Sequence, residues 1–297
     1  MPTEDTLYVN WTMDCEPIEG FTPTGGPKDW ELSARAMGGY VRALSDRGHR
    51  VTLFLMPKTA EVQAGLLEIL RDEGAEIGMH CHPQSRDLGY GGHLGELCAD
   101  AQYDVLRTSR DRIANAVGEA PVAFRPGCFS GTDATYPALC KLGFTHGSVS
   151  LPGRQLPEVA AMWGRAVPFA HWASAESRLA SGDLPFLEMP TAIDLDDLIP
   201  ADDEARDARH LRLERPGILD WGPDIIRRHL QRQIDEDWWL KTLVVMTHNT
   251  REYDDPDNEF RRNLEGIADA IEQAAAELGL TLVHGTLAEI HQIATRA

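Results

Sequence analysis

The sequence predicts an α/β fold, specifically a distorted (β/α)7-type barrel of parallel strands. Apolar β-rich runs alternate with helical patterns through most of the chain, giving about seven or eight repeats without a linker-like break. A single closed or nearly closed barrel is the simplest arrangement of so many repeats, so we expect one domain over residues 1–297. Polar clusters also follow several strands, where parallel barrels carry their functional residues. A doubly wound open sheet is the alternative.

The first half of the chain holds four of the repeats. Short apolar, β-rich runs predict strands, and apolar residues that recur every three or four positions predict helices. Gly48, Gly74 and Gly118 end the first three helices. The expected strands are 7–13, 51–56, 76–82 and 122–125, and the expected helices are 30–47, 59–72, 94–117 and 134–142.

The second half continues the alternation less regularly. Residues 151–185 are rich in Pro, Gly and Trp, and the strongly charged segment 194–222 predicts an exposed excursion. The expected strands are 145–150, 186–193, 242–247 and 281–283, and the expected helices are 223–237 and 258–278.

The composition is that of an acidic globular protein. Hydrophobic residues make up 42% of the 297 positions and charged residues 25%, which are ordinary values. The formal net charge of −19 argues against a nucleic-acid backbone or an anionic membrane as the main partner. The charge does not choose a substrate, because an acidic exterior is usually only a solvated surface. The expected partner is a small-molecule or carbohydrate substrate, and a homo-oligomer is compatible with this composition.

Three features predict a cytoplasmic protein. No stretch approaches the ~18 apolar residues of a membrane span. Residues 1–6 carry acids rather than the basic region and apolar run of a signal peptide. The five cysteines are scattered without CxxC spacing, which is typical of a reducing compartment.

Two strand ends carry paired polar side chains. Alternation along the strand 76–82 puts His80 and His82 on one face, and the same alternation pairs Asp14 with Glu16 after the first strand. Two imidazoles and one carboxylate form a normal ligand set for Zn²⁺ or a similar divalent ion. The second carboxylate can then act as a base toward a water molecule. The pattern predicts a mononuclear metal site with a carboxylate base beside it.

Further candidates lie at other strand ends. Arg125 precedes Pro-Gly at a strand end and can hold the carboxylate base ionised and aimed. His248, at the end of a late strand, is well placed to protonate a departing amine. His93 is either a third imidazole ligand or a residue at a helix start. Cys128 has no activating partner in the sequence and is interpreted as a wall residue; alternation likewise turns Cys15 away from the site.

These motifs resemble the polysaccharide deacetylase (NodB-homology, carbohydrate esterase family 4) superfamily, over most of the chain and in the same order. Residues 12–16 (TMDCE) look like its first motif and residues 76–80 (EIGMH) like the approach to its histidine motif. Residues 124–128 (FRPGC) look like its Arg-Pro motif, and residues 243–248 (LVVMTH) like its last. The resemblance implies a distorted (β/α)7 barrel, a divalent metal, and hydrolysis of an N-acyl bond.

The resemblance also implies a role for each matching residue. Asp14 is the base and Glu16 the metal ligand, or the reverse, because Cys15 separates acids that the family usually places side by side. Arg125 orients the base and His248 is the general acid. The N–H of Cys128 helps to bind the oxyanion.

Two departures indicate a divergent, cytoplasmic branch. The family's second histidine ligand usually lies four residues after the first, and this chain has Gln84 there. Either His82 replaces that ligand, or a more distant residue such as His93 does. The fourth motif, with an aspartate and a tryptophan, has only weak candidates in Glu188 and Asp194.

The first functional hypothesis is a metal-dependent hydrolase of C–N bonds other than peptide bonds, with Zn²⁺ as the expected metal and an acetylated sugar or small amide as the N-deacetylation substrate. The second keeps the same groups and opens a cyclic imide or ureide, as allantoinase-like relatives do. The third is a non-catalytic barrel that binds a sugar or metabolite. Asp14, Arg125 and His248 together argue against the third, because binding alone requires neither a base nor an acid.

Overall fold

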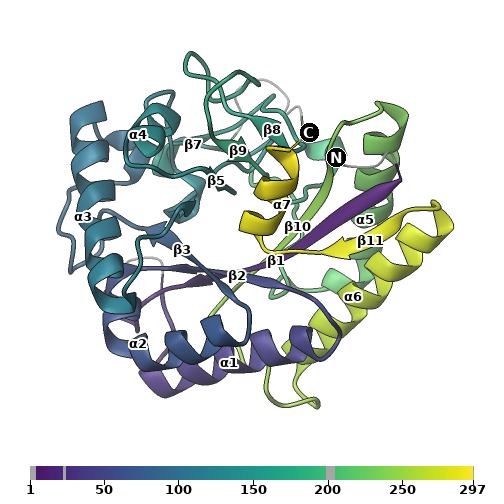
Figure 1. Cartoon of the computed structure of the whole chain (residues 1–297), viewed down its shortest axis with the longest axis horizontal. Coiled ribbons are helices and arrows are strands. Elements are labelled where there is room, and N and C mark those ends of the chain that lie inside the picture. Colours follow the sequence, from purple (N-terminus) through teal and green to yellow (C-terminus); the bar gives the residue numbers. More distant parts are fainter. Residues whose placement is uncertain (1–4, 23–24, 199–204, 297) are drawn as a thin grey trace.

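One curled, mostly parallel sheet with helices on its outer side dominates the fold (Figure 1). A computed structural model of the chain describes residues 5–22, 25–198 and 205–296. Within these residues the main sheet has nine strands, in the order β10-β1-β2-β3-β4-β5-β9-β8, and β11 also pairs with β1. The sheet curls into a half-barrel, which confirms the predicted α/β fold of the distorted (β/α)7 type.

The strand β1 (Thr6–Cys15) is the centre of the sheet. It pairs along its whole length with β10 (Lys241–His248). On its other side, β11 (Thr281–His284) pairs with its first half and β2 (Val51–Leu55) with its second half. All ten residues of β1 are buried, as expected for a strand covered on both faces.

The remaining strands are shorter. β3 (Glu76–Cys81) and β4 (Ala123–Pro126) agree closely with the predicted strands. The predicted strands 145–150 and 186–193 are reduced to β5 (His146–Gly147) and β9 (Leu187–Glu188). Three short strands were not predicted: β8 (His171–Trp172), which is antiparallel to β9, and a hairpin of β6 (Gln155–Leu156) and β7 (Ala161–Met162).

Most helices lie outside the sheet. They are α1 (Trp30–Ser45), α2 (Pro57–Asp72), α3 (Ala99–Val117), α4 (Thr135–Lys141), α5 (Ile218–Asp235) and α6 (Glu259–Glu277). The helix α5 begins five residues before the predicted position, so Pro223 lies inside it. Gly222 packs closely on α6, where a Cβ would lie 2.7 Å from Ile267 Cδ1.

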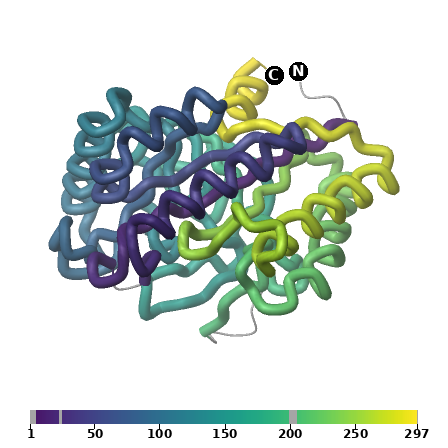
Figure 2. Tube along the Cα trace, turned by 90° about the horizontal axis from the view of Figure 1, so that it is seen from below, coloured from purple at the N-terminus to yellow at the C-terminus, as the bar shows by residue number. Residues whose placement is uncertain are grey.

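The helix α7 (Leu287–Ala294) was not predicted and lies inside the curve of the sheet (Figure 1). Its apolar face joins a buried cluster with residues that point into the barrel, including Tyr8, Phe54 and Val244. Figure 2 shows α7 at the same end of the molecule as the start of β1. The amino-terminal end of the barrel is therefore filled by this helix, and the other end is left for a cavity.

The segment predicted as an exposed excursion, 194–222, is exposed only in part among its described residues, so that prediction was wrong for its buried positions. Leu211 and Leu213 are fully buried, and Leu213 N donates to Met246 O at 3.0 Å beside β10. Ala192 N likewise donates to Val244 O at 3.0 Å. The chain thus returns to β10 beyond β9 and narrows the opening of the half-barrel. Residues 199–204 of this segment, like residues 1–4 of the predicted non-signal start, lie outside the described residues.

None of the helices that the structure describes is long and apolar enough to cross a membrane.

Candidate active site

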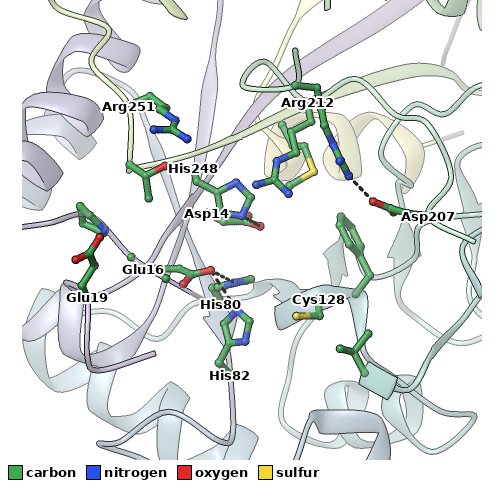
Figure 3. Close-up of a pocket in the computed structure, with 18 of the residues that line it drawn as sticks. Asp14, Glu16, Glu19, His80, His82, Cys128, Asp207, Arg212, His248 and Arg251 are labelled. Carbon is green, nitrogen blue, oxygen red and sulfur yellow. Dashed lines mark hydrogen bonds and ion pairs between the residues drawn. The ribbon is translucent and has the colours of Figure 1, made fainter. Parts of the chain in front are cut away.

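Five predicted site residues meet at the carboxyl-terminal ends of three strands. Asp14 and Glu16 come from β1 and the residue after its end, His80 and His82 from β3 and just beyond it, and His248 from the end of β10 (Figure 3). These five residues line a cavity of about 660 Å³. The sequence placed them at one edge of the sheet, and the structure brings them into one pocket.

Glu16, His80 and His82 form a buried group of potential metal donors. Their ligand atoms all lie within 4.8 Å of one another. Glu16 Oε1 is 3.2 Å from His82 Nε2 and 3.9 Å from His80 Nε2. Two imidazole nitrogens and one carboxylate oxygen that converge in this way match a catalytic Zn²⁺ site, which keeps further positions for water and substrate.

The hydrogen bonds of His80 fix which nitrogen faces this group. Its Nδ1 lies 3.0 Å from the carbonyl oxygen of Arg125. Because a carbonyl only accepts, Nδ1 carries the proton, so in the neutral imidazole Nε2 carries the lone pair. That Nε2 is buried without a hydrogen-bond partner in the described structure. A buried lone pair aimed at a carboxylate fits a divalent metal and is otherwise costly.

His82 is held on the other side by Gly127 and Gln84. A Cβ on Gly127 would lie 2.3 Å from His82 Nδ1, so only glycine allows the ring its position. Gln84 Nε2 is 3.5 Å from His82 Nδ1 and 2.9 Å from His93 Nδ1, whereas Gln84 Oε1 has no partner in the described structure. Turning this amide would let Oε1 accept from His82 Nδ1 and leave Nε2 as the ligand atom.

His93 itself lies outside the metal-donor group. It is half-buried at the N-cap of the short 3-10 helix η1 (Leu94–Glu96), where its N–H donates to Glu96 Oε2. His82 and His93 were the two candidates to replace the family's second histidine ligand. The structure places His82 beside Glu16 and His93 behind Gln84.

Asp14 is buried and paired with Arg125. Arg125 Nη1 donates to Asp14 Oδ1 at 2.9 Å and to Thr12 Oγ1 at 2.8 Å, so the ion pair rests on one nitrogen. Burial alone would raise the pKa of Asp14, but Arg125, His80 and His248 together lower it below its ordinary value. The carboxylate is therefore ionised and ready to accept a proton.

Glu16 is positioned from the far end of the chain. Asn249 Oδ1 accepts from Glu16 N at 3.0 Å, and Asn249 Nδ2 donates to Glu16 O at 2.8 Å. Burial would raise the pKa of Glu16, but His82 and His80 bring it well below its usual range. The amide of Asn249 thus fixes the backbone from which the carboxylate reaches the two imidazoles.

His248 is oriented by Glu214, which the sequence did not single out. His248 Nδ1 lies 2.6 Å from Glu214 Oε1, and its Nε2 lies 3.9 Å from Asp14 Oδ2. Thr247 Oγ1 and Arg212 Nε also donate to Glu214, each at 2.8 Å. Burial would raise the pKa of Glu214, but His248 and Arg212 keep it far below its usual value. An ionised Glu214 thus fixes the orientation of the imidazole.

Cys128 lies in a strained turn at the cavity wall. Cys128 and Phe129 have φ values of 55° and 54°, in the left-handed region that favours glycine. Arg154 Nη1 donates to Cys128 O at 3.0 Å and Trp163 Nε1 donates to Phe129 O, which holds the turn in place. Burial raises the pKa of the Cys128 thiol to about 11, so the thiol is neutral and suits a wall rather than a nucleophile.

Comparison with known proteins finds a family resemblance over part of the chain. Residues 34–147 match the family model described as "Polysaccharide deacetylase". This range includes His80, His82 and Arg125, whereas Asp14, Glu16 and His248 lie outside it. The resemblance to polysaccharide deacetylases is thereby confirmed. A search of curated proteins found no match to this chain.

Solved structures show the same fold at low identity. A protein from Mycobacterium smegmatis named as a polysaccharide deacetylase aligns over 100% of this chain and 92% of its own, with a TM-score of 0.61 and 16% identity. A protein of the same name from Pseudomonas aeruginosa PAO1 aligns over 99% and 92%, with a TM-score of 0.55 and 12% identity. The PuuE allantoinase aligns over 98% of this chain and 91% of its own, with a TM-score of 0.56 and 11% identity.

Neither candidate for the fourth polysaccharide deacetylase motif lines the cavity. Glu188 is buried and accepts from Val149 N, Ser150 N and Ser150 Oγ. Asp194 pairs with Arg228 at 2.9 Å. Glu188 contacts the site only indirectly. It fixes the segment after β5, which also carries Ser148, and the carbonyl of Ser148 accepts from Arg125 Nε at 3.3 Å.

The residues that the sequence reasoning missed lie in the segment taken for an excursion. Arg212 and Glu214 flank the buried Leu213, so alternation puts them on the face opposite to it. This short pattern of charge, leucine and charge was the available signal. The surrounding run of Asp, Glu and Arg concealed it, because such runs are usually solvated surface.

Proposed function

We propose that the chain is a metal-dependent hydrolase that cleaves a C–N amide bond, with N-deacetylation of an acetylated sugar or small amide as its reaction and residues 1–297 as one catalytic unit. The convergence of three polar groups on one cavity supports this proposal. The groups are the metal-donor group, the Asp14–Arg125 pair and the His248–Glu214 pair.

The residues of the chain divide the reaction between them. Glu16, His80 and His82 would hold a divalent metal, for which Zn²⁺ suits the donors, and which would polarise the acyl oxygen and acidify a water. Asp14 accepts a proton from the water as its oxygen bonds to the acyl carbon. The N–H of Cys128 donates to the acyl oxygen as negative charge develops there.

The second half of the reaction belongs to His248. As the C–N bond breaks, its Nε2 donates a proton to the amine nitrogen, and the carboxylic acid leaves with the water's oxygen. Its Nε2 and Asp14 Oδ2 are 3.9 Å apart, so base and acid face the same small volume. Glu214 keeps the imidazole in the tautomer and orientation that this step needs.

The test measures acetate release and metal content on the same preparations. N-acetyl sugars and small N-acyl amines are offered to the metal-loaded protein, before and after chelation. We expect Asp14→Asn to lower kcat by roughly 10²- to 10⁴-fold while the metal stays bound, because the base does not hold the metal. Glu16→Gln should lose the metal. Asp104→Asn, on the exposed surface of α3, is the control. Full activity after thorough chelation would exclude the mechanism.

A second candidate reaction uses the same groups on a cyclic imide or ureide, and the fold likeness to the PuuE allantoinase is the observation that favours it. Ring opening releases no acetate, so a product screen separates the two reactions. If the metal-loaded protein hydrolyses neither class, the third reading, a barrel that only binds a sugar or metabolite, is favoured.

A further inference from the structure

The cavity is rich in cations, although the chain is acidic. The formal net charge of the chain is −19. Five cationic side chains nevertheless line the cavity, within the part of the chain that the structure describes: Lys28, Arg154, Arg212, Arg215 and Arg251. The carboxylates that line it are Asp14, Glu16, Glu19 and Asp207. Such an enrichment against the overall charge indicates a cavity suited to an anion.

Two of these carboxylates are already engaged in the depth of the cavity. Asp14 is paired with Arg125, which is itself fully buried. Glu16 faces the two imidazoles of the metal-donor group. The outer part therefore holds five cations against Glu19 and Asp207, and a metal ion in the depth would add to the positive potential.

The two remaining carboxylates do not neutralise all five cations. Asp207 accepts from Arg154 Nη2 at 2.6 Å and also contacts Arg215. One carboxylate thus serves two guanidinium groups. Lys28 and Arg251 have no ion pair among the described residues, and Arg251 stacks 4.9 Å from the centre of the Phe260 ring. Unpaired cations at a cavity are available to a ligand.

Arg212 is the cation best fixed for recognition. Its backbone is registered against Met246 of β10, and both side chains line the cavity. Its Nε donates to Glu214 Oε1 at 2.8 Å, and its side chain is 30% exposed. With Nε engaged, the two Nη groups have no partner in the described structure and form an edge with parallel N–H groups. Such an edge matches a carboxylate or phosphate in bidentate geometry.

Arg251 faces the same part of the cavity. Figure 3 shows Arg212 and Arg251 on either side of His248 in that view. His248 is the proposed donor to the departing amine, so an anionic group bound there would belong to the substrate's amine portion. The cavity of about 660 Å³ has the size of a small-molecule site.

We propose that the substrate is a small N-acyl compound with an anionic group on its amine portion, and that Arg212, assisted by Arg251, binds this group. This inference rests on the proposed function, which it narrows from amides in general to anionic amides. The recognised chemistry is a carboxylate or a phosphate. A neutral N-acetyl polymer would leave Arg251 and the Nη groups of Arg212 without an anionic partner.

Matched pairs of compounds test the inference. The carboxylate pair is an N-acetyl amino acid and its carboxamide, and the phosphate pair is N-acetylglucosamine 6-phosphate and N-acetylglucosamine. For at least one pair we expect kcat/KM to be about 10- to 100-fold higher for the anionic member, the factor of a charge-assisted hydrogen bond pair. The pair that shows this preference identifies the anion. The preference should weaken as ionic strength rises.

Substitutions assign the preference to residues. Arg212→Gln should bring the ratio of anionic to neutral kcat/KM close to one. The ratio is the readout because Arg212 also touches Glu214, and a general loss of activity leaves a ratio unchanged. Arg251→Gln should reduce the ratio several-fold and serves if the first variant does not fold. Arg107→Gln, which removes an exposed cation on α3, should leave the ratio unchanged.

The outcomes separate this inference from the proposed function. Hydrolysis with a ratio near one for both pairs, or a ratio that survives both cavity variants, overturns the inference and leaves the hydrolase standing. If no compound is hydrolysed, the proposed function fails instead. Equilibrium binding of the same pairs to Asp14→Asn then decides the anion question: tighter binding of an anionic member supports the site, and equal binding overturns it.

Discussion

Glu214→Gln removes a single buried charge and keeps the shape of the side chain. In the wild type, Glu214 Oε1 lies 2.6 Å from His248 Nδ1. A glutamine oxygen can still accept that hydrogen bond, so the tautomer of His248 is retained and only the charge is lost. An opposite charge at this range stabilises an imidazolium by about 2 to 4 kcal/mol at an effective dielectric constant near 20. Because His248 must carry its proton to the amine, kcat/KM should fall roughly 30- to 1,000-fold.

The assay is kcat/KM for acyl release, with metal content and the unfolding midpoint measured on the same samples. Glu265→Gln is the matched control, because its pair with Arg261 lies on the surface of α6 and contributes less than about 0.5 kcal/mol. If Glu214→Gln keeps its metal, its fold and most of its activity, Glu214 does not act through His248.

Three further outcomes are expected. Gly127→Ala should weaken metal binding roughly 10- to 100-fold, because the new Cβ meets the His82 ring; an unchanged metal affinity would contradict the assigned ring position. Cys128→Ala should keep kcat within about threefold, since its neutral thiol only lines the wall; a loss beyond 100-fold would make the thiol a participant. Burial raises the pKa of Glu188 to about 7 from an ordinary value of 4.5, so the native state binds the proton more tightly than the unfolded chain. The resulting stability is complete below about pH 4.5 and is lost as pH rises through 7. The free energy of urea unfolding of the wild type, relative to Glu188→Gln, should therefore fall by about 2 to 3 kcal/mol from pH 5 to pH 8. Equal changes in both proteins would refute this.

Periodicity was sufficient for the elements that carry the metal-donor group. The strands β1, β3 and β10 are continuous buried runs, so their ends and the direction of Asp14, His80 and His248 follow from alternation alone. Arg125 was predicted from its position before Pro-Gly at a strand end, and the resemblance to a family supplied the role of the Cys128 N–H. These residues depend mainly on local sequence.

Elements that depend on distant partners could not be predicted in this way. The helix α7 is only eight residues long and is stabilised by the barrel interior that it fills. The strands β5 and β9 are short, and part of the backbone beside them is hydrogen-bonded to a side chain rather than to another strand. For example, Glu188 accepts from Val149 N. Glu214 was missed because its burial comes from β10 and α6, and nothing in its own segment indicates that contact.

The central position of β1 has a consequence for how the molecule is made. Its neighbour β10 lies more than 200 residues later, with Asp14 opposite His248 in the register. All three donors of the metal site are synthesised within the first 82 residues, yet the backbone of Glu16 is held by Asn249. A ribosome-bound chain that has not reached Asn249 therefore carries every ligand and lacks the geometry to use them. Closing so long a loop comes late in folding, so the metal-donor group would reach its final geometry only after Asn249 has been added to the chain.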